Sequence, residues 1–257
     1  MAMSFVVVIP ARYASTRFPG KPLIDLNGKP MVVRVAERAQ QSSATQVLVA
    51  TDDARIVAAC AAHGVAHVMT RSDHPTGTDR LSEVVASLNL PDEAVVVNVQ
   101  GDEPLIPAHV IDQVAAMLDA NPNAAIATLC HPIHDVADVT NPNVVKCVVS
   151  ETGEAMYFSR APIPFARDAW RDGVASMPDG LPMYRHIGLY AYRAGLLRRF
   201  PTLSIPAIES YEALEQLRAL AHGFRIAVAV VQEALPPGID TPEDYERIKA
   251  SFFAPTL

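Results

Sequence analysis

The feature that most constrains the fold is an alternation, in the first half of the chain, of short apolar runs with longer amphipathic segments. The apolar runs, rich in Val, Leu and Ile, lie at residues 5–9, 46–50 and 94–99. The segments with helical patterns lie between them, at residues 30–41, 54–63 and 80–88. Nearly continuous hydrophobicity is typical of strands that helices bury on both faces. The alternation predicts a mostly parallel sheet with right-handed crossovers, and hence a Rossmann-like three-layer α/β/α core over residues 1 to about 130.

The second half of the chain is less regular. Its patterns predict a hairpin (144–149 with 155–158), a long loop (161–182), a strand (187–192), a helix (211–222), a strand (226–231) and a last helix (242–252). Thr241 fits the N-cap of that last helix and Asp244 the third position of a capping box. We expect a single domain spanning 1–257, with a smaller irregular β/loop region at about 131–225 and a C-terminal part at 226–257.

Composition excludes several classes of protein. Of the 257 residues 50% are hydrophobic and 19% are charged, so the chain can bury a large core. The net charge of -7 argues against a nucleic-acid partner. No apolar stretch is long enough to cross a bilayer, so we expect a cytoplasmic protein without a membrane partner. The three cysteines, Cys60, Cys130 and Cys147, form no metal-binding or disulfide pattern and are expected to be buried small hydrophobes.

The most informative motif is the loop after the first apolar run, IPARYASTRFPGKP at residues 9–22. It follows a buried strand, at the strand end where open α/β sheets bind their ligands. Arg12, Arg17 and Lys21 place three cations in a stretch without acidic residues, although the chain as a whole is acidic. Arg and Lys bind phosphate oxygens, so the loop predicts a triphosphate site. The alternative is a solvated basic loop.

Two separated aspartates are candidate metal ligands. Asp102 follows the third apolar run in VNVQGDEP at residues 97–104, where Gly101 permits a close approach of the backbone. Asp240 lies in PPGIDTPED at residues 236–244, outside the predicted last helix. Mg²⁺ prefers oxygen ligands and typically uses one or two carboxylates together with substrate phosphates. An ordinary turn aspartate is the alternative reading of Asp102.

A further loop, RSDHPTGTDR at residues 71–80, contains a glycine and leads into a predicted helix. Backbone N–H groups near Thr76 and Gly77 would suit an anion or a base. The alternative is helix capping by Thr78. The glycine patterns of P-loops and of dinucleotide-binding folds are absent, as are the motifs of serine hydrolases and zinc proteases. The histidine pairs 63/67 and 131/134 are expected not to bind metal.

Taken together, these segments resemble the 3-deoxy-manno-octulosonate cytidylyltransferases (CMP-Kdo synthetases). The resemblance continues through NPNVVK at 141–146, YFSR at 157–160, RHIGLY at 185–190, LEQLR at 214–218 and GIDTPED at 238–244. It covers nearly the whole chain, whereas sialic-acid cytidylyltransferases share a similar opening loop alone. It implies a nucleotidyltransferase fold and a Mg²⁺-dependent reaction in which CTP and 3-deoxy-D-manno-octulosonate (Kdo) give CMP-Kdo and pyrophosphate, for lipopolysaccharide synthesis.

The resemblance also implies roles for individual residues. The catalytic candidates are Arg12 and Lys21, which would hold the triphosphate, and Asp102 and Asp240, which would bind Mg²⁺. The candidates for nucleotide binding are Ala11, Arg12, Arg17, Lys21, Thr76 and Gly77. The candidates for acceptor binding are Arg80, Gln100, Arg160, His186, Tyr190, Glu212 and Gln216. Three of these have a plain structural alternative: a surface position for Arg80, a core hydrogen bond for His186 and packing for Tyr190.

The resemblance further suggests a homodimer formed through the irregular region at about 131–225, which would also bind the acceptor. Two other functions stay open on the sequence. One is a cytidylyltransferase for sialic acid or another 2-keto sugar acid. The other is a non-catalytic nucleotide-binding protein of the same fold.

Overall fold

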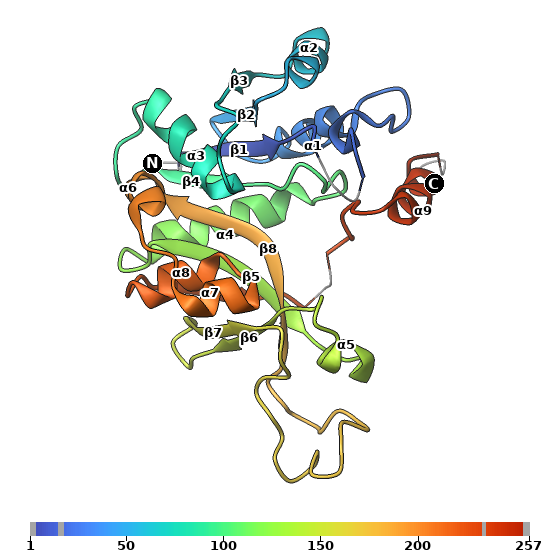
Figure 1. The fold of residues 1–257 in the computed structure, drawn as a ribbon, viewed down its shortest axis with the longest axis vertical. Helices are drawn as coiled ribbons and strands as arrows, with labels where there is room; N and C mark the ends of the chain where they lie inside the picture. The colour runs from blue at the N-terminus through green and yellow to red at the C-terminus, as the bar shows by residue number, and fades with distance from the viewer. Residues whose placement is uncertain (1–3, 15–17, 233–234, 254–257) are drawn as a thin grey trace. The chain divides into compact units, whose positions relative to one another are not determined.

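The computed structural model describes residues 4–14, 18–232 and 235–253, without side chains for 251–253. The chain forms two compact units, each built from separated stretches of sequence (Figure 1). Unit 1 comprises Met1–Ala116, Ala191–Pro201 and Leu235–Leu257, and unit 2 comprises Met117–Tyr190 and Thr202–Ala234. In the part of the chain that is described, no helix is long and apolar enough to cross a membrane.

Unit 1 contains four parallel strands in the order β3-β2-β1-β4. Their bounds are β1 Phe5–Ala11, β2 Gln46–Thr51, β3 His67–Met69 and β4 Val95–Asn98. Val8 on β1 lies opposite Leu48 on one side and Asn98 on the other. Almost every residue of β1, β2 and β4 is buried, as their continuous hydrophobicity predicts. The carboxyl ends of β1 and β4 therefore open side by side at one edge of the sheet.

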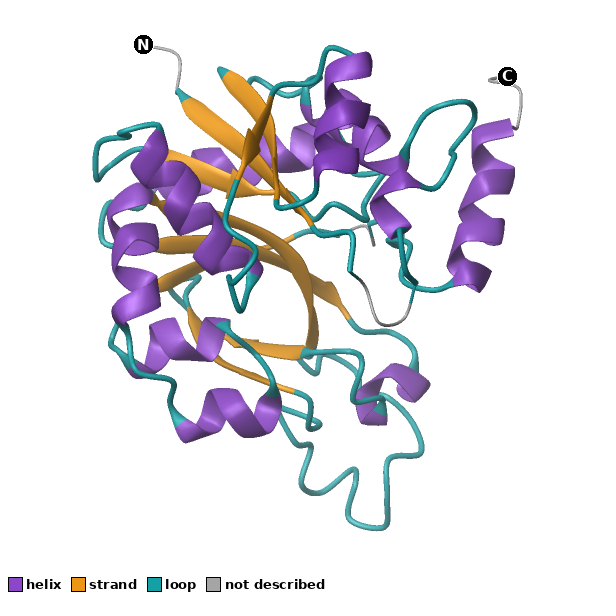
Figure 2. Ribbon diagram, turned by 45° about the horizontal axis from the view of Figure 1, so that its top comes forward, coloured by secondary structure: helices purple, strands orange, loops and turns teal. Residues whose placement is uncertain are grey.

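Along the sequence, helices alternate with these strands. Figure 2 shows strands flanked by helices. Those of unit 1 are α1 Met31–Ala39, α2 Ala54–Ala62, α3 Gly77–Ser87, α6 Ala194–Arg199 and α9 Pro242–Phe253, with a 3₁₀ turn, η1, at Lys21–Leu23. A longer helix, α4 Ala108–Ala120, leads from unit 1 into unit 2. The buried face of α1 consists of aliphatic side chains at helical spacing, which is what holds it against the sheet.

Unit 2 combines a parallel pair of strands with an antiparallel hairpin. Strand β5, Ile126–Pro132, pairs in parallel with β9, Ile226–Val230. Strand β6, Lys146–Val149, pairs antiparallel with β7, Ala155–Ser159, and with the start of β8, Tyr184–Arg193. The short helices of this unit are α5 Val136–Thr140, α7 Ala207–Glu212 and α8 Gln216–Ala221. A second 3₁₀ turn, η2 Phe200–Thr202, lies on the chain where unit 1 passes into unit 2.

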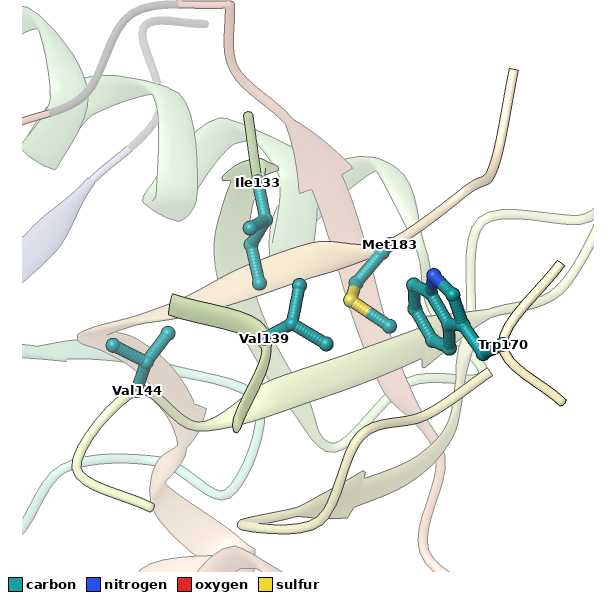
Figure 3. Close-up of a cluster of buried hydrophobic side chains, with 5 residues drawn as sticks. All are labelled: Ile133, Val139, Val144, Trp170 and Met183. Carbon is teal, nitrogen blue, oxygen red and sulfur yellow. The ribbon is translucent and has the colours of Figure 1, made fainter. Parts of the chain in front are cut away.

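The long loop between β7 and β8 packs into a small hydrophobic cluster of unit 2. Trp170 from the loop is 2% exposed and packs with Ile133, Val139, Val144 and Met183 (Figure 3). The indole N–H of Trp170 donates to the carbonyl of Ser176, 2.9 Å away, so its polar atom is satisfied within the loop. The loop, which the structure describes in full, has no helix or strand, and the buried Trp170 side chain attaches it to the rest of unit 2.

Most of the predicted elements are confirmed, including the three-layer class, the strands of the first half, the hairpin, the long loop and the capped last helix. Asp244 accepts hydrogen bonds from the backbone N–H groups of Asp240 and Thr241, and Thr241 Oγ1 accepts one from the N–H of Asp244, which completes the predicted capping box. Cys60, Cys130 and Cys147 are buried and free, as expected. Sequence patterns did not indicate α4, β3 or β5, and the single helix predicted at 211–222 is wrong.

Candidate active site

Two loops meet at the carboxyl ends of β1 and β4, and a glycine makes their approach possible. A Cβ atom on Gly101 would lie 2.8 Å from the carbonyl oxygen of Pro10. That distance is a backbone clash that no rotamer change relieves, so glycine is required here. The turn after β4 is thereby pressed against the end of β1, and Asp102 emerges beside the basic loop.

The side chains of Asp102 and Asp240 converge on the ammonium group of Lys21. Lys21 Nζ lies 2.6 Å from Asp102 Oδ2 and 3.2 Å from Asp240 Oδ1. The Lys21 side chain is 13% exposed, against 28% for Asp102 and 47% for Asp240, so the site opens toward solvent on the side of Asp240. All three residues belong to unit 1.

Backbone contacts bring Asp240 to this position. The N–H of Ile239 donates to the carbonyl oxygen of Asp102, 2.8 Å away. A Cβ on the neighbouring Gly238 would come within 3.1 Å of the same oxygen, which a side chain tolerates only if the backbone moves. Lys21 in turn begins η1, directly after Gly20 in the left-handed region (φ 72°). Each of the three charged residues is thus placed by its own backbone constraint.

This geometry fits a divalent metal ion. The Lys21 ammonium shows that oxygen atoms of both carboxylates reach one common cation. Within the described residues, no group of three or more His, Cys, Asp and Glu side chains gathers around a common point. Two carboxylates are the protein donor set that Mg²⁺ typically uses when substrate phosphates and water complete its six ligands.

The predicted nucleotide-binding residues lie around the same strand end. The Arg12 guanidinium donates to the carbonyl of Pro75 at 3.4 Å, and a Cβ on Gly77 would make ordinary contact with the Pro10 ring, 3.6 Å away. The 71–80 loop therefore adjoins the end of β1, where Ala11 is buried. Arg17 lies outside the described residues.

The loop before α3 corrects one sequence-based alternative. The N-cap of α3 is Thr76 and not Thr78. Thr76 Oγ1 accepts from the N–H of Asp79 at 3.2 Å, and the Asp79 carboxylate accepts from the N–H of Thr76 at 3.2 Å. Thr78 is instead buried in the first turn of the helix. The helix begins three residues earlier than predicted because this reciprocal pair satisfies its first backbone donors.

Two acceptor candidates belong to unit 1. The Arg80 side chain is fully buried, and its guanidinium donates to Asp52 at 2.9 Å, to the Thr70 hydroxyl and to the carbonyl of Arg71. These contacts tie the end of β2 to α3. Gln100 lies in the turn that precedes Asp102, half-buried.

The other acceptor candidates belong to unit 2, where two of them, His186 and Tyr190, share a second cluster with Phe158. The His186 ring lies 5.1 Å from the ring of Phe158 and 5.2 Å from that of Tyr190, and its Nε2 atom is 3.1 Å from Thr128 Oγ1. Burial lowers the pKa of His186 to about 3, so the ring is neutral near pH 7. Because Nε2 is engaged with Thr128, the neutral imidazole leaves Nδ1 for a hydroxyl ligand.

Arg160 and Glu212 are joined by hydrogen bonds in unit 2. Arg160 donates from its side chain to the carbonyl oxygens of Pro142, Glu212 and Ala213, at 2.8, 2.6 and 3.3 Å. The Glu212 carboxylate accepts from the Ser159 hydroxyl at 2.5 Å and from the N–H of Arg160 at 2.9 Å. Gln216 follows on the chain as the first residue of α8, half-buried.

A family model described as cytidylyltransferase matches residues 6–226 of the chain. The chain belongs to the cytidylyltransferase family. A structure of a CMP:2-keto-3-deoxy-manno-octonic acid synthetase complexed with CTP is 41% identical to it, with a TM-score of 0.88, over 97% of this chain and 98% of that one. The matched region contains both units, so this enzyme is a nucleotidyltransferase built on the three-layer fold that its sequence predicts.

Two more distant structures share the fold of this cytidylyltransferase. One is a cytidylyltransferase from Leptospira borgpetersenii serovar Hardjo-bovis, 16% identical with a TM-score of 0.60, over 97% of this chain and 87% of that one. The other is a 4-diphosphocytidyl-2C-methyl-D-erythritol synthase, 15% identical with a TM-score of 0.61, over 97% and 99%.

Sequence reasoning missed one titratable residue next to the site. Glu103 follows Asp102 directly, and its Cγ atom lies 3.6 Å from where a Cβ of Gly238 would be. Burial, reinforced by the negative charge of Asp102, raises the pKa of Glu103 to about 8. The adjacent acidic pair in the sequence was a signal for an acidic site, but only the structure shows that Asp102, and not Glu103, pairs with Lys21.

Proposed function

We propose that this cytidylyltransferase transfers the cytidylyl group of CTP to the anomeric hydroxyl of Kdo, releasing pyrophosphate, and so activates Kdo for lipopolysaccharide synthesis. The observation that carries the proposal is the convergence of Asp102 and Asp240 on one cation beside the basic loop. The acceptor is taken from the similar structure, which is that of a synthetase for CMP:2-keto-3-deoxy-manno-octonic acid. We further propose that the enzyme works in the cytoplasm, where CTP is available.

Asp102 and Asp240 would hold Mg²⁺ in this proposal. When bound, the ion would neutralise phosphate charge and lower the pKa of the attacking hydroxyl. The family's opening loop supplies Arg12 and Lys21 for the triphosphate, and we propose that both charges stabilise the departing pyrophosphate. Transfer at phosphorus depends mainly on alignment and charge neutralisation, so a side chain that forms a covalent bond is not required.

In this proposal Lys21 interacts with two kinds of anion, the carboxylates of Asp102 and Asp240 and the phosphates of CTP. In the structure its ammonium is the cation that the two carboxylates share. Phosphate oxygens of CTP would compete with those carboxylates for the same group. Lys21 is mostly buried, and its ammonium already has two carboxylate acceptors. To bind Lys21, the phosphates of CTP would therefore have to replace these carboxylates and not water.

For the acceptor we propose the residues that the family pattern implies. The Kdo carboxylate would bind Arg160, whose guanidinium is held by carbonyl oxygens and, within the described residues, forms no ion pair with a carboxylate. Neutral and acidic groups suit the sugar hydroxyls. For these we propose Gln100, His186, Tyr190, Glu212 and Gln216. Arg80, a fully buried cation, is proposed as a further acceptor residue on the family pattern alone.

We also propose a homodimer formed through the irregular part of unit 2. Its support is the resemblance and the exposure of large apolar side chains in this unit, Met156 at 64% and Phe165 at 57%. Sedimentation of the purified enzyme would test it directly, with a monomer at micromolar concentration as the contrary outcome.

The reaction is tested by pyrophosphate release from purified enzyme with Mg²⁺ and CTP, with and without Kdo, and with sialic acid as a parallel acceptor. We expect release that requires both CTP and Kdo. Release with sialic acid alone would transfer the acceptor assignment to that sugar. No release with either, in a folded protein that still binds CTP, would indicate a non-catalytic nucleotide-binding protein.

A further inference from the structure

Unit 2 contains a buried lysine, Lys146, to which no role has yet been assigned. Lys146, the first residue of β6, has no exposed surface. Its ammonium donates to the carbonyl oxygens of Asn141 at 3.0 Å and of Val144 at 2.6 Å. Within the described residues it forms no ion pair, although Asp138, Glu212 and Arg160 lie near enough for their charges to act on it.

Such a lysine is unfavourable for stability. Burying an ammonium group with neutral partners carries a desolvation cost that an apolar side chain of similar length would not. Burial accordingly lowers the pKa of Lys146. Packing alone therefore does not explain why a lysine occupies the start of β6, where the less polar side chains of Val144 and Cys147 are buried without such a cost.

The ammonium closes a tight turn. The Asn141 carbonyl accepts both from the N–H of Val144, at 3.1 Å, and from Lys146 Nζ. The Asn141 side chain also accepts from the N–H of Asn143, at 3.0 Å. The turn at 141–144 is thus held by the Asn141 side chain, which accepts from a backbone N–H of the turn, and by Lys146, which donates to two of its carbonyl oxygens.

This turn holds Arg160 on one side. The Pro142 carbonyl, at the centre of the turn, accepts from Arg160 Nη1 at 2.8 Å. The carbonyls of Glu212 and Ala213 hold the guanidinium on its other side. Three carbonyl oxygens orient the guanidinium without neutralising it, which leaves a fixed positive charge suited to an anionic ligand.

We infer that Lys146 is a positioning residue for the acceptor: by closing the 141–144 turn, it sets the Pro142 carbonyl that orients Arg160 toward the carboxylate of a 2-keto sugar acid. This inference rests on the proposed function, since it assumes that Arg160 binds the acceptor's carboxylate. Lys146 itself touches no substrate in this account. Its effect is therefore confined to the acceptor and passes through Arg160.

The test is a double-mutant cycle on the full-length enzyme, with Lys146→Met, Arg160→Met and the double variant. Initial rates are measured against Kdo and against CTP, with Cys147→Ala as a control for core disturbance in the same strand. We expect Lys146→Met to raise the KM for Kdo about tenfold, as loss of one orienting hydrogen bond to a charged group would, with the KM for CTP within about twofold. Adding Lys146→Met to Arg160→Met should change nothing further.

Equal increases of both KM values, or effects of the two substitutions that simply add, would overturn the inference and leave Lys146 as a structural residue. If Lys146→Met does not fold, Asn141→Ala loosens the same turn and must give the same one-sided increase for the inference to stand. The proposed function fails separately, through absence of wild-type turnover with Kdo. In that case calorimetric titration of the wild type and Lys146→Met with Kdo decides the inference, and equal affinities overturn it.

Discussion

The N–H of Ile239 donates to the carbonyl oxygen of Asp102, 2.8 Å away, and this single backbone contact joins two loops that are far apart in the sequence. It brings Asp240 to within reach of the cation that Asp102 binds. The carboxylate pair is therefore a property of backbone packing, which the glycines at 101 and 238 permit. Substitutions that disturb this packing should affect catalysis even though they remove no charge.

Gly101→Ala tests that relationship. The new Cβ would lie 2.8 Å from the Pro10 carbonyl, so the turn must move away from β1. We expect destabilisation of about 1–3 kcal/mol, the range for overpacking, and a fall in kcat that exceeds any change in KM. Urea unfolding and steady-state rates measure the two effects. Gly188→Ala is the matched control for stability, because among the described residues no atom beyond its two chain neighbours lies within 4 Å of the added Cβ. Equal unfolding midpoints for the two variants would contradict the prediction.

Asp102→Asn tests the metal assignment. The change removes one charge from the carboxylate pair and almost no volume. We expect turnover to fall at least about 100-fold, since loss of an outer-shell partner alone costs 10–100-fold in metal sites. Circular dichroism and thermal unfolding should show an intact fold. Asp119→Asn, at an exposed position on α4, controls for the loss of a carboxylate; wild-type rates with Mg²⁺ in Asp102→Asn would refute the assignment.

The first half of the fold was predictable because its strands are buried on both faces. Continuous Val-rich runs identified β1, β2 and β4, and a rule of α/β sheets then placed the basic loop and Asp102 at a common edge. Helix α4 was missed although its buried residues Val110, Ile111, Val114, Ala115 and Leu118 recur at helical spacing. Strand β5 did not stand out because most of it is buried. A buried segment flanked by other apolar residues gives little periodicity by which to separate strand from helix.

The predicted helix at 211–222 failed for a reason that sequence patterns do not contain. Ala213 adopts a left-handed conformation, φ 50°, which divides the segment into α7 and α8. The carbonyl oxygens of Glu212 and Ala213 bind the guanidinium of Arg160 instead. In an uninterrupted helix these oxygens would be occupied by N–H groups four residues later. A distant arginine thus overrides a local preference, as is common at functional sites.

Lys21→Met tests the shared cation. The variant leaves Asp102 and Asp240 facing each other without the ammonium that bridges them. We therefore expect divalent metal to bind the free enzyme more tightly than it binds the wild type, because metal no longer displaces Lys21. The KM for CTP should rise about 10- to 100-fold, in line with the 1.5–3 kcal/mol of a hydrogen bond to a charged group. Thermal shifts with Mg²⁺ or Mn²⁺ in the absence of CTP measure the first effect, with Lys29→Met as the control.

His186 should make stability depend on pH in a defined window. Burial lowers its pKa in the folded state to about 3, from 6.5 in an unfolded chain. Between these values the unfolded chain binds a proton that the folded enzyme does not, so folding stability is complete above about pH 6.5 and is lost as the pH falls. The slope from this one group is at most about 1.4 kcal/mol per pH unit.

Urea unfolding at pH 7, 6 and 5 should show a shallower dependence of unfolding free energy on pH for His186→Gln than for the wild type. His63→Gln, at an exposed position after α2, controls for the loss of a histidine. Identical slopes for wild type and His186→Gln would mean that the imidazole takes up its proton inside the folded enzyme, and a neutral role toward the sugar hydroxyls would then fail below pH 6.5.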